Sequence, residues 1–137
     1  MAQALKASGM NVIGCDLISS RVETLKSIGI EAFKVPEMCE SIKVDAVFMT
    51  SGSDKAIDTA LKFVRDGGKI LVFSSTPNNF GYANNEIYYR ELTVLGSYSP
   101  SPKDLKDSLG LLAKKEVKVS GLSTEYPLDK VQKAIND

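Results

Sequence analysis

The chain has 137 residues, a length typical of one domain with a substantial core. Its 17 lysine and arginine residues balance 17 aspartate and glutamate residues, so no basic surface for nucleic acid is predicted. The two cysteines lack C-x-x-C spacing and no apolar run is long enough to cross a bilayer. These features predict a cytoplasmic protein with reduced thiols and no membrane partner.

The first predicted elements are a helix over residues 1–8, ended by Gly9, and a buried strand from Asn11 to Asp16. An acid at the carboxyl end of a parallel strand can accept hydrogen bonds from both hydroxyls of an adenosine ribose. Aspartate is also a common turn residue. On these residues alone, Asp16 therefore fits a ribose contact and an ordinary turn about equally well.

A helix ended by Gly29 is predicted next. Ser19 or Ser20 is expected to cap it, which places Arg21 on its first turn, close to Asp16. Three residues at helical spacing are expected to form its core face: Val22, Leu25 and Ile28.

The rest of the chain alternates between strand and helix patterns. We expect a strand over residues 31–35, at most a helical turn over 38–43, a buried strand over 44–50 and a helix over 54–64 capped by Ser53. A turn at Asp66-Gly67-Gly68 is expected to lead into a buried strand over 69–74, which is followed by a polar loop over 76–85, a short helix over 86–90 and a strand over 92–98. The last expected elements are a helix over 103–114 with Leu105, Leu109 and Leu112 facing inward, an extended piece over 123–126 and a helix begun by Pro127. Such alternation predicts the α/β class, a doubly wound parallel sheet with helices on both faces.

Four segments, taken in order, carry a resemblance to a known family. They read V-I-G-C-D followed by S-R, D-A-V-F-M-T-S-G-S, L-K-F-V-R-D-G-G-K-I-L-V-F-S and R-E-L-T-V-L-G-S-Y-S. This order resembles the Rossmann-like cofactor domain of the zinc-containing, medium-chain alcohol dehydrogenases, and most of all its sorbitol (polyol) and threonine dehydrogenase branches. The resemblance covers nearly the whole chain, so residues 1–137 are interpreted as part of a NAD-binding domain. The intact protein is then expected to transfer hydride from an alcohol or polyol to NAD.

The resemblance implies a set of cofactor-binding residues. Asp16 matches the family's ribose-binding acid and Arg21 a basic residue near the same ribose. This pair favours NAD over NADP, because a 2'-phosphate would meet a carboxylate. Further positions match on the adenosine side, beside the nicotinamide and on the last strand: Leu17, Thr50, Ser51, Gly52 and Ser53, then Phe73, Ser74 and Ser75, then Gly96, Ser97 and Tyr98. For each of these, ordinary strand-end chemistry is the competing interpretation.

Two of the family's features are missing from the chain. The glycine-rich turn that holds the cofactor's pyrophosphate would lie just before Met1. The sequence has no histidine, and Cys15 and Cys39 do not match the ligands of the family's catalytic zinc, which belong to a separate domain. We therefore expect NAD and zinc as cofactors of the intact protein, and no metal ligands, catalytic residues or activity in the isolated chain.

Three alternatives remain open at this point. A class I methyltransferase also places an acid after its second strand, although it would end in an antiparallel hairpin. A non-catalytic nucleotide-binding module is the second alternative. The third is a zinc-independent relative such as a quinone reductase, which the cofactor preference of the intact protein would separate because those enzymes usually use NADP.

The strand expected over Leu92 to Tyr98 suggests that the protein forms a homodimer or larger assembly. It is apolar and uncharged, and the resemblance implies that it pairs with a second copy across a two-fold axis. The resemblance also implies that the family's first, central strand is missing. The Asn11 strand must then either pair with the Val44 strand or leave two open edges.

Overall fold

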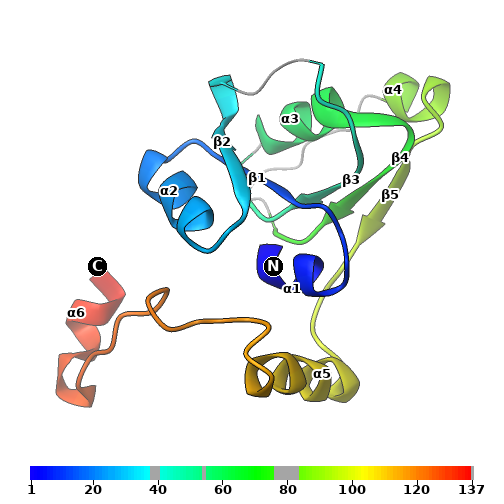
Figure 1. Ribbon diagram of the computed structural model, residues 1–137. Helices are drawn as coiled ribbons and strands as arrows, with labels where there is room; N and C mark the ends of the chain where they lie inside the picture. The colour runs from blue at the N-terminus through cyan, green and yellow to red at the C-terminus, as the bar shows by residue number, and fades with distance from the viewer. Residues whose placement is uncertain (38–40, 54, 76–83, 137) are drawn as a thin grey trace. The chain divides into compact units, whose positions relative to one another are not determined.

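The computed structural model describes residues 1–37, 41–53, 55–75 and 84–136 (Figure 1). The chain divides into two compact units, one of residues 13–101 and one that combines residues 1–12 with residues 102–137. Every strand belongs to the first unit, whereas the second is helical. In the described ranges, no helix has the length and apolar character needed to cross a membrane.

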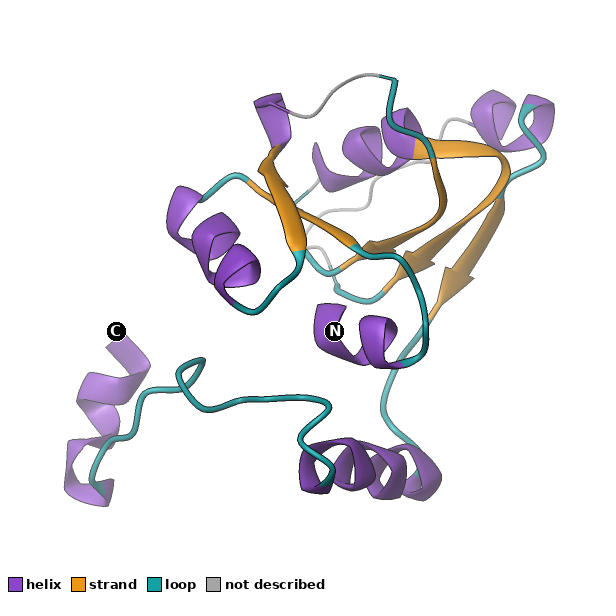
Figure 2. Cartoon of the chain, in the orientation of Figure 1, coloured by secondary structure: helices purple, strands orange, loops and turns teal. Residues whose placement is uncertain are grey.

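The unit of residues 13–101 alternates strands and helices, as the sequence predicts (Figure 2). Its elements are β1 (Ile13–Asp16), α2 (Ser19–Ser27), β2 (Glu31–Lys34), a 3-10 turn (Val35–Glu37), β3 (Val44–Met49), α3 (Lys55–Phe63), β4 (Val64–Val72), α4 (Asn84–Tyr89) and β5 (Thr93–Gly96). All pairings are parallel, β1 with β2 and then β3–β4–β5 with β4 in the middle. The prediction of an α/β fold with parallel strands is confirmed. The helical turn and polar loop predicted around residues 38–40 and 76–83 lie outside the described residues.

The core of this unit lies between the three-stranded sheet and α3. In the sheet, Val47, Ile70 and Val94 occupy one cross-strand row, and Ile70 is fully buried. The apolar cluster around it comprises Met49, Ile57, Ala60, Val64 and Leu92. Burial of each large side chain contributes about 1.5–3 kcal/mol, so this cluster fixes which face of the sheet α3 covers.

The helix α3 passes directly into β4 without a loop. The β3–β4 register therefore starts at Val44 opposite Val64 and resumes at Ala46 opposite Lys69, so the Arg65–Gly68 segment bulges out of the ladder. Gly67 has φ +67°, which favours glycine. A side chain at Gly68 would come within 2.7 Å of the Arg65 carbonyl oxygen. The predicted glycine turn is thus a bulge inside a longer strand.

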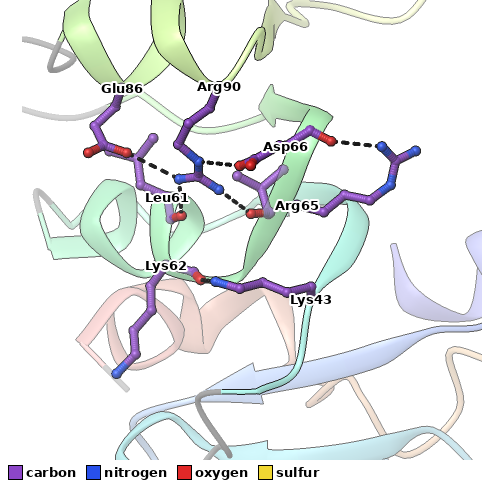
Figure 3. A network of polar contacts seen from close by, with 8 residues as sticks. Lys43, Leu61, Lys62, Arg65, Asp66, Glu86 and Arg90 are labelled. Carbon is purple, nitrogen blue, oxygen red and sulfur yellow. Dashed lines mark hydrogen bonds and ion pairs between the residues drawn. The ribbon is translucent and has the colours of Figure 1, made fainter.

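A guanidinium group holds this bulge in place (Figure 3). Arg90 Nη1 donates to the Leu61 carbonyl at 2.8 Å and Arg90 Nη2 to the Val64 carbonyl, both at the end of α3. Its Nε donates to Asp66 Oδ1 at 2.7 Å, and Nη1 also reaches Glu86 at 3.2 Å. In return the Gly67 N–H donates to the Arg90 carbonyl at 2.8 Å. Arg90 thereby ties α4 and the start of β5 to the α3–β4 junction.

The strand β1 differs from its prediction in burial. Ile13 and Cys15 are exposed, and Gly14 and Asp16 are only half-buried. The expectation of a fully buried strand is wrong, because β1 pairs with β2 alone and β3 with β4 alone among the described strands. The alternative in which the Asn11 and Val44 strands pair is therefore not the one observed. Both strands keep an open edge.

The helical unit contains α1 (Ala2–Ala7), α5 (Pro102–Ala113), a 3-10 turn (Leu128–Lys130) and α6 (Val131–Asn136). Its clearest tertiary link is the Gln3 amide, which donates to the Lys118 carbonyl and accepts from the Lys118 N–H, each at 2.8 Å. The predicted inward face of α5 is wrong for this unit. The three leucines expected on that face are exposed among the described residues: Leu105, Leu109 and Leu112.

We predict that Arg90→Met lowers the free energy of unfolding by about 2–3 kcal/mol, because it leaves two helix-end carbonyls without their donor. Urea denaturation would measure the change. Lys26→Met is the matched control, since it removes only an exposed ion pair with Glu23 and should cost at most about 0.5 kcal/mol. Equal midpoints for the two variants would contradict a structural role for Arg90.

Candidate functional site

The carboxyl ends of β3, β4 and β5 lie level with one another. Met49, Val72 and Gly96 occupy one cross-strand row. The ladder continues one step further, with the Phe73 N–H donating to the Met49 carbonyl at 2.9 Å and the Ser97 N–H to the Val72 carbonyl at 3.1 Å. The three segments predicted as cofactor contacts therefore leave the sheet along one edge, the edge at which open α/β sheets bind ligands.

Two of these segments are joined directly. The Ser74 hydroxyl donates to the Ser51 carbonyl at 2.7 Å. A side chain at Gly52 would come within 2.8 Å of the Ser75 carbonyl oxygen, so only glycine fits there without a shift. The Ser53 N–H donates to the Ser51 hydroxyl at 3.3 Å, which closes the loop on itself. The loop after β3 is thus packed against the end of β4.

Other polar groups on this edge remain available. Within the described part of the chain, the hydroxyls of Thr50, Ser53, Ser75 and Ser97 make no hydrogen bond to protein, and all four residues are exposed. The apolar ring of Phe73 next to them is 48% exposed. Tyr98 is also exposed. This mixture of exposed aromatic rings and hydroxyls without a partner among the described residues suits a ligand with both polar and flat apolar parts.

Asp16 is the last residue of β1 and is partly buried. Its Oδ1 accepts the Ile18 N–H at 2.9 Å, and its Oδ2 lies 3.5 Å from Nη1 of Arg21, the first-turn residue of α2. The predicted serine cap is wrong: α2 begins at Ser19 with Ile18 at its N-cap and no side-chain cap bond. The Asp16 carboxylate serves that end of the helix instead. Each oxygen keeps acceptor capacity for a diol.

The surroundings of Asp16 contain an apolar contact but no metal site. Leu17 is 61% exposed beside the carboxylate. Cys15 is exposed by surface area, yet desolvation of its thiol raises the pKa and the Asp16 carboxylate raises it further, so the thiol stays protonated at neutral pH. Among the described residues, no group of three or more histidine, cysteine, aspartate or glutamate side chains could hold a metal ion.

The structure thus gathers the predicted residues into two groups. Thr50–Ser53, Phe73–Ser75 and the residues after β5 share one edge of the three-stranded sheet. Asp16, Leu17 and Arg21 belong to the two-stranded sheet. In the part of the chain that the structure describes, no hydrogen bond or ion pair connects the groups.

Sequence reasoning missed two features that shape this edge. The bond from Ser74 to Ser51 spans 23 positions, and no local pattern announces it. Arg90 is the second, because its donors reach the ends of elements that lie more than 20 residues earlier in the chain. Its only sequence signal is its place directly before the apolar strand pattern.

Residues 1–114 match the family model described as zinc-binding dehydrogenase. The chain belongs to this family. The predicted resemblance is confirmed, and the methyltransferase alternative is set aside. The alcohol dehydrogenase of Geobacillus stearothermophilus is 26% identical over 137 residues, which cover 94% of this chain and 40% of that protein. Sorbitol dehydrogenase 1 of Saccharomyces cerevisiae is 31% identical over 80 residues, covering 58% of this chain and 22% of the relative.

Solved structures share the fold. An alcohol dehydrogenase from Escherichia coli CFT073 in complex with NADH superposes with a TM-score of 0.86 at 20% identity, over 98% of this chain and 43% of the other. This likeness confirms the Rossmann-like class. The chain spans less than half the length of these relatives.

Proposed function

We propose that this chain is the cofactor-binding part of a NAD-dependent, zinc-containing alcohol or polyol dehydrogenase. The observation that carries the proposal is the Asp16 carboxylate at the end of β1, held by the Ile18 N–H and facing Arg21. Membership of the zinc-binding dehydrogenase family and the similarity to alcohol and sorbitol dehydrogenases support it. NADH in the similar Escherichia coli structure supports the choice of nucleotide.

In this proposal the chain binds and orients the nucleotide. Asp16 accepts both ribose hydroxyls, Leu17 packs against the adenine, and Arg21 lies beside the same ribose. The adenosine side is lined by Thr50, Ser51, Gly52 and Ser53, and the nicotinamide side by Phe73, Ser74, Ser75, Gly96, Ser97 and Tyr98. When bound, NAD supplies the carbon that accepts the hydride.

The residues of the chain do not fit a catalytic zinc. The sequence has no histidine, and the described residues hold no cluster of ligating side chains. In the proposal, the zinc ligands and the pocket for an alcohol or polyol therefore lie in another part of the intact protein, while residues 1–137 contribute part of its NAD-binding domain.

We expect Asp16 to set the choice between NAD and NADP. In the intact protein, Asp16→Ser should relax discrimination against NADP by about 1–2 kcal/mol, the range of a charge-assisted hydrogen bond. Asp16→Asn tests charge alone, because it keeps an acceptor for the Ile18 N–H and should relax the preference similarly. Michaelis constants for both cofactors measure the ratio.

The control for this test is Asp129→Asn, an exposed acid of the helical unit, which should leave the ratio unchanged. The double variant Asp16→Ala with Arg21→Ala should weaken NAD binding outright. If both Asp16 variants keep the parent ratio, Asp16 does not belong to the site. A parent protein that prefers NADP would favour the quinone reductase alternative.

A second expectation is that the isolated chain retains no stoichiometric zinc and shows no dehydrogenase activity. The reason is the lack of ligand clusters among its described residues and of any histidine in its sequence. Metal analysis and an assay of alcohol-dependent NAD reduction on the purified chain measure both quantities. Turnover at ordinary enzyme rates would refute the proposal that the zinc ligands lie in another part of the intact protein.

We also propose a homodimer or larger assembly in which β5 pairs with its counterpart in a second copy. Leu95 is 45% exposed on β5, and the edge of this strand away from β4 is unpaired among the described strands. The Ser97 N–H points to β4, so by alternation along the strand the Gly96 N–H points to the open edge. A side chain at Gly96 would meet nothing within 4 Å.

These facts define a matched pair of variants. Gly96→Pro removes an outward N–H without touching the β4–β5 ladder, so we expect it to give monomers. Gly96→Ala keeps the N–H and should keep the oligomer. Light scattering on the purified proteins measures the mass. A monomeric parent, or a proline variant of unchanged mass, would rule out this contact.

A further inference from the structure

We propose that Ser74 is a positioning residue whose hydroxyl holds the Ser51–Ser53 loop against the end of β4, so that the loop meets the cofactor in one fixed geometry. This inference rests on the proposed function and changes the role of Ser74 within it. The side chain acts through the loop and does not touch the cofactor.

The first support is the use of the hydroxyl. Ser74 is half-buried and its Oγ donates to the Ser51 carbonyl at 2.7 Å. A serine hydroxyl has a single proton to donate, so this bond uses all its donor capacity. The neighbouring Ser75, by contrast, is exposed, and its hydroxyl makes no hydrogen bond within the described residues. Of these adjacent serines, Ser75 is the one whose hydroxyl no described residue uses.

The second support is the close approach of the two backbones. The position of a Cβ at Gly52 lies 2.8 Å from the Ser75 carbonyl oxygen, a separation that real side chains do not adopt. The loop can lie this close only because residue 52 is glycine. Ser74 holds one side of the contact through Ser51, and the ladder bond from the Phe73 N–H to the Met49 carbonyl, 2.9 Å, holds the other.

The third support is the rigidity of the loop on its far side. The Ser53 N–H donates to the Ser51 hydroxyl at 3.3 Å, and the Ala56 N–H donates to the Ser53 carbonyl at 2.9 Å at the start of α3. The loop is therefore fixed to α3 at one end and to β4 at the other. Without Ser74, its carbonyl anchor at Ser51 is lost, and the free hydroxyls of Ser53 and Ser75 lose their set spacing.

The first experiment needs no cofactor. Amide hydrogen exchange in the intact protein should be about fivefold to tenfold faster in Ser74→Ala at Ser53, whose N–H donates to the Ser51 hydroxyl, which is the effect of one lost hydrogen bond. Ser74→Thr keeps the hydroxyl and should restore the parent rates. Ser27→Ala is the control, because it removes an equally short bond, 2.8 Å to the Thr24 carbonyl, that joins only neighbouring residues of α2. Unchanged exchange at Ser53 would overturn the proposal.

The second experiment measures cofactor kinetics. Ser74→Ala should raise the KM for NAD by about fivefold to tenfold and leave kcat unchanged, whereas Ser74→Thr should be close to the parent. Gly52→Ala should raise the same KM. The KM of the double variant, Ser74→Ala with Gly52→Ala, should be only slightly above that of the weaker-binding single variant, since both changes act through one loop. Fully additive effects, or a fall in kcat alone, would contradict the positioning role. A parent that does not bind NAD would overturn the proposed function, and the exchange rates would still decide whether Ser74 holds the loop.

Discussion

The pairing of β4 with strands on both sides is the constraint on which the rest of this unit depends. Because α3 runs directly into β4, the start of that pairing falls on a bulge, and the Arg90 guanidinium holds the bulge by donating to the helix-end carbonyls and to Asp66. A shift of one residue would turn every side chain of β4 to the other face. The alignment of Met49, Val72 and Gly96 at the opposite end is thus set at the Arg90 end of the strands.

Strong local patterns predicted much of this fold. The apolar runs of β3 and β4 and the stripe of α3 specify which elements form, and the alternation of strands with helices specifies that the sheet is parallel. Weaker signals failed where a non-local group competed. Ser19 is a favourable N-cap residue by type, yet α2 begins one residue earlier than this cap would require, with Ile18 at the N-cap position. The Asp16 carboxylate accepts the Ile18 N–H there. The exposure of β1 depends on which strands are present beside it, which no window of sequence reports.

The candidate site was predicted as a list of residues, and the structure separates those whose side chains bond to other described residues from those whose side chains do not. The resemblance assigned Ser51 to the loop on the adenosine side, and Ser74 and Ser75 to the turn beside the nicotinamide. It could not tell which hydroxyls are already used, because that depends on bonds between segments 23 residues apart. Groups that already bond within the protein need no further ordering when a ligand binds. The hydroxyls of Ser53 and Ser75, by contrast, have no partner among the described residues.

Asp16 and the Ser51–Ser53 loop stand in different sheets, and no described hydrogen bond or ion pair connects them. Both sheets nevertheless belong to one compact unit, residues 13–101, so packing within that unit holds the two groups together without a direct bond. Loops that are held in place before a ligand binds keep the entropy cost of binding small. The Asp16 carboxylate accepts the Ile18 N–H and the Ser51 carbonyl accepts the Ser74 hydroxyl, so each group has a partner within the protein that fixes its position.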